Sequence, residues 1–143
     1  MGRHYVWGIA AYLLVVSGWE TMTTTAAGAD EKGAGPTAVY ELRTYTTAPG
    51  RLPALHKRFR DHTMKLFVKH GMRNVAYWTP AEKENTLVYV IAHNSRDAAK
   101  KSWQAFRDDP VWKKAFSESR ADGPIVNKVE SQFLNPTNYS PLK

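Results

Sequence analysis

Four segments of the chain have the pattern of β-strands, and in the first of them apolar and polar residues alternate with a period of two. In the third segment, Leu87, Tyr89 and Ile91 share one face, and the residues between them are also apolar. A strand that is apolar on both faces is typically buried on both, so we place this one at the centre of the sheet. The four predicted strands cover residues 37–47, 72–79, 86–93 and 125–134.

The segment between the first two strands has helical spacing instead. Leu55, Phe59 and Leu66 follow one another at intervals of four and seven positions, so they fall on one face of an α-helix. Gly71 is well suited to follow a helix, because glycine adopts the left-handed conformation found there without strain. The pattern predicts a helix over residues 51–70.

Two short-range signals predict further helices between the third and fourth strands. Ser95 is a good N-cap, because its hydroxyl can accept a hydrogen bond from a free backbone amide, and it predicts a helix that runs to about Arg107. Asp109 followed by Pro110 predicts the start of another helix. Gly123 and the proline after it are expected to end that helix.

The predicted order β-α-β-β-α-β is that of a ferredoxin-like α+β domain with an antiparallel sheet. Helices that cover one face of such a sheet leave the other face open. Val88, Val90 and Ala92 would make the open face apolar, so we expect a second copy of the chain to cover it. The sequence therefore predicts a homodimer through the sheet face.

The N-terminal residues have the pattern of an export signal. Arg3 precedes an apolar run over residues 6–19, and Ala27-Gly28-Ala29 forms an A-x-A cleavage pattern. The run is shorter than the roughly 20 residues that cross a membrane, so we expect no membrane span in the mature chain; an uncleaved anchor is the alternative. We expect a periplasmic or secreted protein that comprises a signal peptide (1–29), a flexible leader (30–36), a domain (37–135) and an irregular tail (136–143).

The amino-acid composition excludes several kinds of functional site. The chain has 143 residues and no cysteine, which indicates one domain without disulfides, thiolate metal sites or a thiol nucleophile. The net charge is +7, and cleavage after residue 29 would leave it unchanged. Basic residues concentrate in residues 51–73 and 96–120. These stretches are either solvated helix faces or surfaces that attract an anionic partner.

His62 is the candidate catalytic residue. It lies three positions after Phe59 and four before Leu66, which places it on the helix face turned towards the sheet. An imidazole between sheet and helix could act as a base, an acid or a haem ligand. The competing interpretation is a core histidine with satisfied ring nitrogens.

The candidate ligand-binding residues come from several elements. Arg43 could hold an anionic ligand, or it could pair with Glu41 on the same strand face. His93 could lie at a pocket mouth or simply at the end of a strand. The aromatic candidates could line an apolar pocket or belong to the core. Together with His62 the candidates are Arg43, Trp78, Tyr89, His93 and Trp103.

No compact catalytic or cofactor motif is present. The sequence lacks G-x-S-x-G, a P-loop, G-x-G-x-x-G and H-E-x-x-H. The histidines are scattered, so we expect no metal site and no obligatory cofactor. RNA-recognition domains share the predicted element order, but residues 86–91 lack their signature rich in glycine and aromatic residues. No nucleic-acid partner is expected.

Short motifs in a fixed order resemble the NIPSNAP family. They correspond to its opening strand and turn, its first helix end and second strand, its entry into the late helix, and its last strand. The resemblance spans about residues 39–135. The motifs are Tyr40-Glu41-Leu42-Arg43-Thr44-Tyr45 with Pro49-Gly50, His70-Gly71 with Tyr77-Trp78, Asp109-Pro110-Val111-Trp112, and Glu130-Ser131 with Leu134.

The resemblance implies a dimeric α+β barrel, in which two ferredoxin-like sheets pack face to face and ligands bind between sheet and helices. Relatives in that superfamily include cofactor-free monooxygenases and haem-degrading enzymes, whereas NIPSNAP proteins have no settled chemistry. One hypothesis is a homodimeric module that binds a small apolar or anionic ligand or serves as a scaffold. The alternative is a cofactor-free monooxygenase or a haem-binding enzyme. A cavity beside His62 would favour the enzyme, and a filled core would favour the module.

Overall fold

The computed structural model describes residues 38–142. The predicted signal peptide and leader lie outside this range. Each predicted strand and helix within it is present, with its ends shifted by one or two residues, except that the last helix ends before Gly123. The elements are β1 (Val39–Thr47), α1 (Leu52–Arg58), the π-helical turn η1 (Phe59–Thr63), α2 (Met64–Lys69), β2 (Arg73–Trp78), β3 (Thr86–His93), α3 (Arg96–Asp108), α4 (Pro110–Glu118) and β4 (Val126–Leu134).

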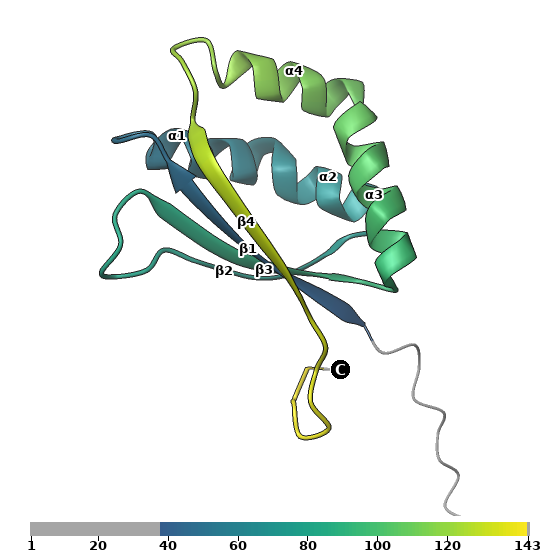
Figure 1. The fold of residues 1–143 in the computed structure, drawn as a ribbon. Coiled ribbons are helices and arrows are strands. Elements are labelled where there is room, and N and C mark those ends of the chain that lie inside the picture. Colours follow the sequence, from purple (N-terminus) through teal and green to yellow (C-terminus); the bar gives the residue numbers. More distant parts are fainter. Residues whose placement is uncertain (1–37, 143) are drawn as a thin grey trace, which may run out of the picture. The chain divides into compact units, whose positions relative to one another are not determined.

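The four strands form one antiparallel sheet in the order β2-β3-β1-β4. The helices lie on one face of it (Figure 1). This arrangement confirms the predicted ferredoxin-like α+β fold and the inner position of β3. In the register, Arg43 of β1 stands opposite Tyr89 of β3 on one side and Ser131 of β4 on the other. Side chains from three strands therefore meet on the face that the helices cover.

Aromatic rings fill the centre of the layer between sheet and helices. Tyr89 is fully buried and stacks on Tyr77 and Phe67. Phe59 meets the Tyr89 ring edge-on, with the ring centroids 5.2 Å apart. Burying one such side chain stabilises a fold by about 1.5–3 kcal/mol. The core is therefore filled at Tyr89, which is a packing residue.

The first helix is continuous but contains one π-helical turn. The Met64 amide donates to the Phe59 carbonyl, five residues back, instead of the usual four. The Thr63 hydroxyl donates to the Arg58 carbonyl at 3.2 Å, which helps to satisfy the widened turn. The extra residue in the turn rotates the positions that follow it. Thr63 takes the buried position, and the prediction that His62 faces the sheet is wrong for this reason.

The sheet face opposite the helices carries a second apolar cluster. Trp78 also lies on this face, opposite Val88 in the register, and it is 52% exposed. The apolar character of the open face was predicted, whereas its coverage by a second copy stays a prediction. The cluster comprises Ala38, Tyr40 and Ala92, with Val75, Val90 and Leu134 packed against them.

The predicted helix caps are present. The Ser95 hydroxyl accepts a hydrogen bond from the Ala98 amide at 3.0 Å. The Asp109 carboxylate accepts one from the Val111 amide at 2.8 Å. Within residues 38–142, no helix has both the length and the apolar character needed to cross a membrane.

Candidate functional site

Two cavities lie between the sheet and the helices α3 and α4. The inner cavity has a volume of about 230 Å³, and the outer one about 480 Å³. Both are lined by Tyr45, Phe106, Trp112 and Phe116, so they adjoin, and we call the pair the aromatic cavity. Val129 of the edge strand β4 closes part of the inner cavity. The cavity thus lies beside the filled core around Tyr89.

The spacing of aromatic residues in α3 and α4 builds one wall of the aromatic cavity. Trp103 and Phe106 are three residues apart in α3, and Trp112 and Phe116 are four apart in α4, so each pair shares a helix face. The Phe106 and Trp112 ring centroids lie 4.4 Å apart across the helix junction. The two helices therefore present one continuous aromatic surface.

A buried carboxylate organises the polar part of the wall. Glu41 is only 2% exposed. One of its oxygens accepts hydrogen bonds from Arg43 and Ser131, each at 2.6 Å. The other accepts from Trp103 at 2.6 Å and lies 2.9 Å from the His93 Nε2 atom. Burial alone would raise the pKa of Glu41, but these four partners lower it to about 2.

Ionised Glu41 neutralises Arg43, which therefore brings no free charge to the cavity. The Arg43 guanidinium lies over the Trp103 ring, 4.3 Å from its centroid, and both residues line the outer cavity. His93 is fully buried behind Glu41, so it does not lie at a pocket mouth. Of the candidate residues, the structure brings Arg43 and Trp103 to the wall of the aromatic cavity, whereas Tyr89 belongs to the core. Trp78, on the edge strand β2, pairs with Val88 and lines a separate cavity of about 390 Å³ beside the first helix.

Arg58 is a buried cation that sequence analysis did not single out. It is 5% exposed and donates a hydrogen bond to the Ser119 hydroxyl at 3.2 Å. Its guanidinium lies 5.3 Å from the ring centroids of both Trp112 and Phe116. It forms no ion pair with any acidic residue of the described chain. Its position three residues after Leu55, on the apolar helix face, was the available signal.

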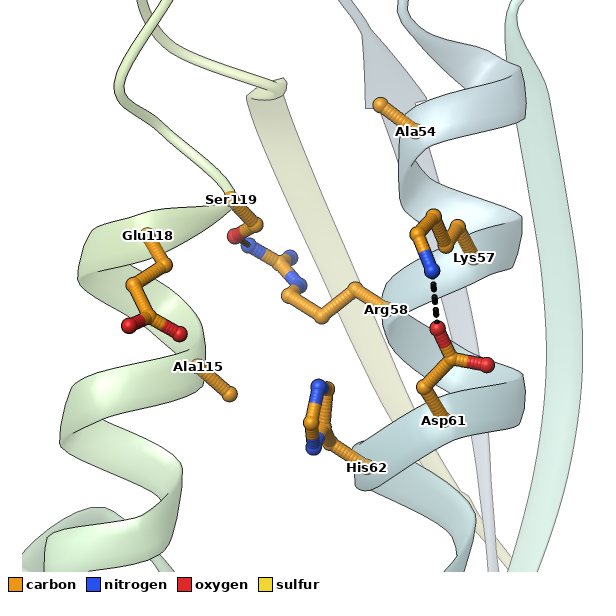
Figure 2. Close-up of a pocket in the computed structure, with 8 residues that line it drawn as sticks. All are labelled: Ala54, Lys57, Arg58, Asp61, His62, Ala115, Glu118 and Ser119. Atoms are coloured by element: carbon orange, nitrogen blue, oxygen red, sulfur yellow. Dashed lines mark hydrogen bonds and ion pairs between the residues drawn. The ribbon is translucent and has the colours of Figure 1, made fainter.

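A third cavity, of about 260 Å³, lies on the far side of Arg58. Figure 2 shows His62 pointing towards Ala115 of α4, with the Lys57–Asp61 ion pair on the same helix. We call it the His62 cavity. It lies between the first helix and α4 rather than between sheet and helix. Arg58 lines both this cavity and the inner aromatic cavity, so it separates the two.

The cavities offer few of the side chains that bind a metal ion or haem iron. Residues 38–142 contain no group of three histidine, aspartate or glutamate side chains close enough to hold a metal ion. Among the described residues that line the aromatic cavity, Tyr45 is the only one of a type that usually binds haem iron axially, and its hydroxyl accepts a hydrogen bond from Arg43 at 3.4 Å. The residues of the aromatic cavity therefore do not fit haem.

The fold has counterparts among solved structures. A NIPSNAP family protein of unknown function from Agrobacterium tumefaciens C58 is 25% identical, with a TM-score of 0.66 over 76% of this chain and 96% of that one. A NIPSNAP-like domain protein from Burkholderia xenovorans is 16% identical, with a TM-score of 0.65 over 74% and 90%. The cofactor-independent oxygenase SnoaB from Streptomyces nogalater shares the fold at 16% identity, with a TM-score of 0.53 over 73% and 98%.

Sequence comparison identifies the family directly. No curated protein matches this chain. The NIPSNAP family model matches residues 40–141, which include all four strands apart from Val39 and all the residues that line the cavities. The match covers more than half of the chain and agrees with the motifs noted in the sequence. The chain belongs to the NIPSNAP family.

Proposed function

We propose that this domain is a binding module for a small, largely apolar molecule that occupies the aromatic cavity. The observation that carries the proposal is a cavity walled by four aromatic side chains of α3 and α4, beside a core that is already filled. Cavities with apolar walls and a few placed polar groups are the usual form of small-molecule sites. Arg43, fixed by Glu41, supplies one such group.

The lining of the aromatic cavity favours binding over catalysis. Acid–base chemistry at neutral pH needs a group that can exchange a proton there, most often an imidazole or a carboxylate. The described residues that line the aromatic cavity include neither histidine, aspartate nor glutamate. The guanidinium groups of Arg43 and Arg58, which also line it, stay protonated.

A second candidate function rests on the His62 cavity. A cavity beside His62 is the feature that would favour an enzyme, and the fold is shared with a cofactor-independent oxygenase. If this candidate holds, the protein should consume oxygen with an aromatic substrate, and His62→Ala should abolish the consumption without unfolding the protein. Oxygen-electrode traces that match buffer alone would leave only the binding function.

We further propose that the module acts as an exported homodimer. The apolar cluster around Tyr40 and Ala92 supports a partner on the open sheet face, and the pattern of residues 1–29 supports export. Edman sequencing of the protein recovered from the producing cell tests the second point. A chain that begins at Asp30 is expected, and one that keeps Met1 would contradict cleavage.

Fluorescence titration with N-phenyl-1-naphthylamine, a neutral probe with a naphthalene and a phenyl ring, tests binding in the aromatic cavity. We expect saturable fluorescence at one site per chain. Val129→Trp, which fills the inner cavity from β4, should weaken binding by roughly tenfold or more. Glu130→Trp, on the opposite face of the same strand, is the matched control and should bind as the unmodified protein does. Absence of saturable binding to the unmodified protein would refute the proposal.

A further inference from the structure

Arg58 is a buried charge that the rest of the described protein does not neutralise. Its neighbour Arg43 is buried too, but Glu41 compensates it at 2.6 Å. Among residues 38–142, Arg58 has only the neutral Ser119 hydroxyl as a hydrogen-bond acceptor and two aromatic rings beside it. A buried charge without a counter-charge destabilises a fold. The presence of such a charge at Arg58 therefore points to a role in ligand binding.

The nearby carboxylates have other partners. Asp61 accepts a hydrogen bond from Lys57 at 2.5 Å, and Glu118 pairs with Lys114. Burial lowers the pKa of Arg58, and the charge of Arg120 lowers it further, yet a guanidinium remains protonated at neutral pH. The positive charge of Arg58 is therefore available to a ligand.

The geometry of the guanidinium suits an anion. Its Nε atom is buried and has no hydrogen-bond partner among the described residues. The rings of Trp112 and Phe116, on one face of α4, each lie 5.3 Å from the guanidinium and hold it beside the inner cavity. A guanidinium held in this way offers its N–H fork to one carboxylate or sulfonate group, with two parallel hydrogen bonds.

The helix that carries Arg58 is also distorted at this point. The π-helical turn begins at the next residue, Phe59, and the Thr63 hydroxyl binds the Arg58 carbonyl. Such turns often occur at functional sites, because they re-aim the side chains of a regular helix. Here the turn leaves both Arg58 and His62 on the side of the helix that faces α4.

We propose that the ligand of the aromatic cavity is an amphipathic organic acid whose single anionic group binds Arg58 while its apolar rings lie against Phe106, Trp112 and Phe116. The inference rests on the proposed binding function and adds the chemical class of the ligand. Arg107 and Lys113 line the outer cavity; Lys113 lies 3.8 Å from the Asp108 carboxylate, whereas Arg107 forms no ion pair with a described residue and gives the mouth the same positive sign as Arg58. A positive mouth attracts an anionic ligand and speeds its association.

A matched pair of probes tests the inference. 1-Anilinonaphthalene-8-sulfonate has the ring system of N-phenyl-1-naphthylamine plus one sulfonate. We expect the purified protein to bind the sulfonate roughly tenfold more tightly than the neutral probe. Arg58→Met, which keeps the apolar stem, should abolish that preference, so that the variant binds the two probes with affinities within about twofold of each other.

Two variants make the comparison specific. Arg120→Met removes an exposed cation that follows the C-terminal end of α4. This variant should keep the preference for the sulfonate. Arg58→Lys keeps the charge without the fork, so it should retain a preference of roughly threefold. It also provides the measurement if Arg58→Met does not fold, which circular dichroism shows.

The outcomes separate this inference from the proposed function. Equal affinity for both probes, or a preference that survives Arg58→Met, would overturn the role of Arg58 and leave the binding module standing. Failure of both probes to bind would refute the binding module, and the assignment of an acid would fail with it.

Discussion

The indole nitrogen of Trp103 donates a 2.6 Å hydrogen bond to the carboxylate of Glu41, across 62 positions of sequence. The bond joins α3 to the sheet at β1. It also fixes the Trp103 ring under the Arg43 guanidinium, at the wall of the outer cavity. Packing and site geometry therefore depend on the same contact.

Trp103→Phe tests this dependence. The substitution keeps an aromatic ring but removes the N–H donor, which leaves one Glu41 oxygen with His93 as its remaining partner. We expect the free energy of unfolding to fall by about 1–3 kcal/mol in urea denaturation. Tyr139→Phe removes a polar group from a highly exposed ring and should change it by less than about 0.5 kcal/mol. Equal effects of the two substitutions would contradict a stabilising role for the bond.

The lowered pKa of Glu41 predicts a loss of stability in acid. The pKa is about 2 in the fold and 4.5 as the ordinary value, so the unfolded chain binds the proton first as the pH falls. The contribution of Glu41 is present in full above about pH 5 and is lost as the pH falls towards 2. By linkage it amounts to roughly 3 kcal/mol.

Glu41→Gln should flatten the acid limb of the stability–pH curve, although it lowers stability at neutral pH. Glu130→Gln changes an exposed carboxylate on β4 and should leave the acid limb as it is. The curve is measured by urea denaturation between about pH 2 and pH 7. An unchanged acid limb in Glu41→Gln would show that other groups control the loss of stability.

The elements of the fold were predictable because their signals are local. The continuous apolar run of β3 located this strand at the same residues that the structure assigns, and the caps Ser95 and Asp109 mark helix starts through their own side chains. The polar partners of Glu41 were harder to predict from the sequence. The pairing with Arg43 followed from two positions on one strand face, but Ser131 lies 90 positions away and is brought near only by the sheet register.

The binding site was predicted only in part. Arg43 and Trp103 were named as candidates and line the outer cavity. Arg58 was counted among the basic residues of a helix that has a solvated face, because burial of a single arginine depends on how α4 packs against it. The orientation of His62 depends on a π-helical turn, which no spacing rule for regular helices could reveal.

Asp109 connects α2 to α4 and predicts a graded effect of substitution. Its carboxylate caps α4 through the Val111 amide and also binds Lys69 at 2.7 Å and His70 at 2.8 Å. The hydrogen bond from Lys69 and, to a smaller extent, the one from His70 and those from the backbone amides hold the pKa of Asp109 below its ordinary value. Asp109→Asn keeps a capping oxygen but loses the charge, whereas Asp109→Ala loses both.

We therefore expect the melting temperature to fall in the order unmodified protein, Asp109→Asn, Asp109→Ala, with a total decrease of roughly 5 °C or more. Differential scanning calorimetry measures it. Because α4 carries Trp112, the alanine variant should also bind the naphthylamine probe more weakly. Asn and Ala variants that melt together would show that the cap itself contributes little.

The open sheet face predicts the oligomeric state. Val90 lies in the apolar cluster of that face, on an inner strand, so a lysine there would be forced against the partner subunit. Light scattering of the unmodified protein should give twice the mass of one chain, and Val90→Lys should give the mass of one. Val68→Lys places the same change at an exposed position of α2 and should remain dimeric. A monomeric unmodified protein would show that the open face meets water or another partner, and the dimer would then be rejected while the aromatic cavity, which one chain builds alone, would stand.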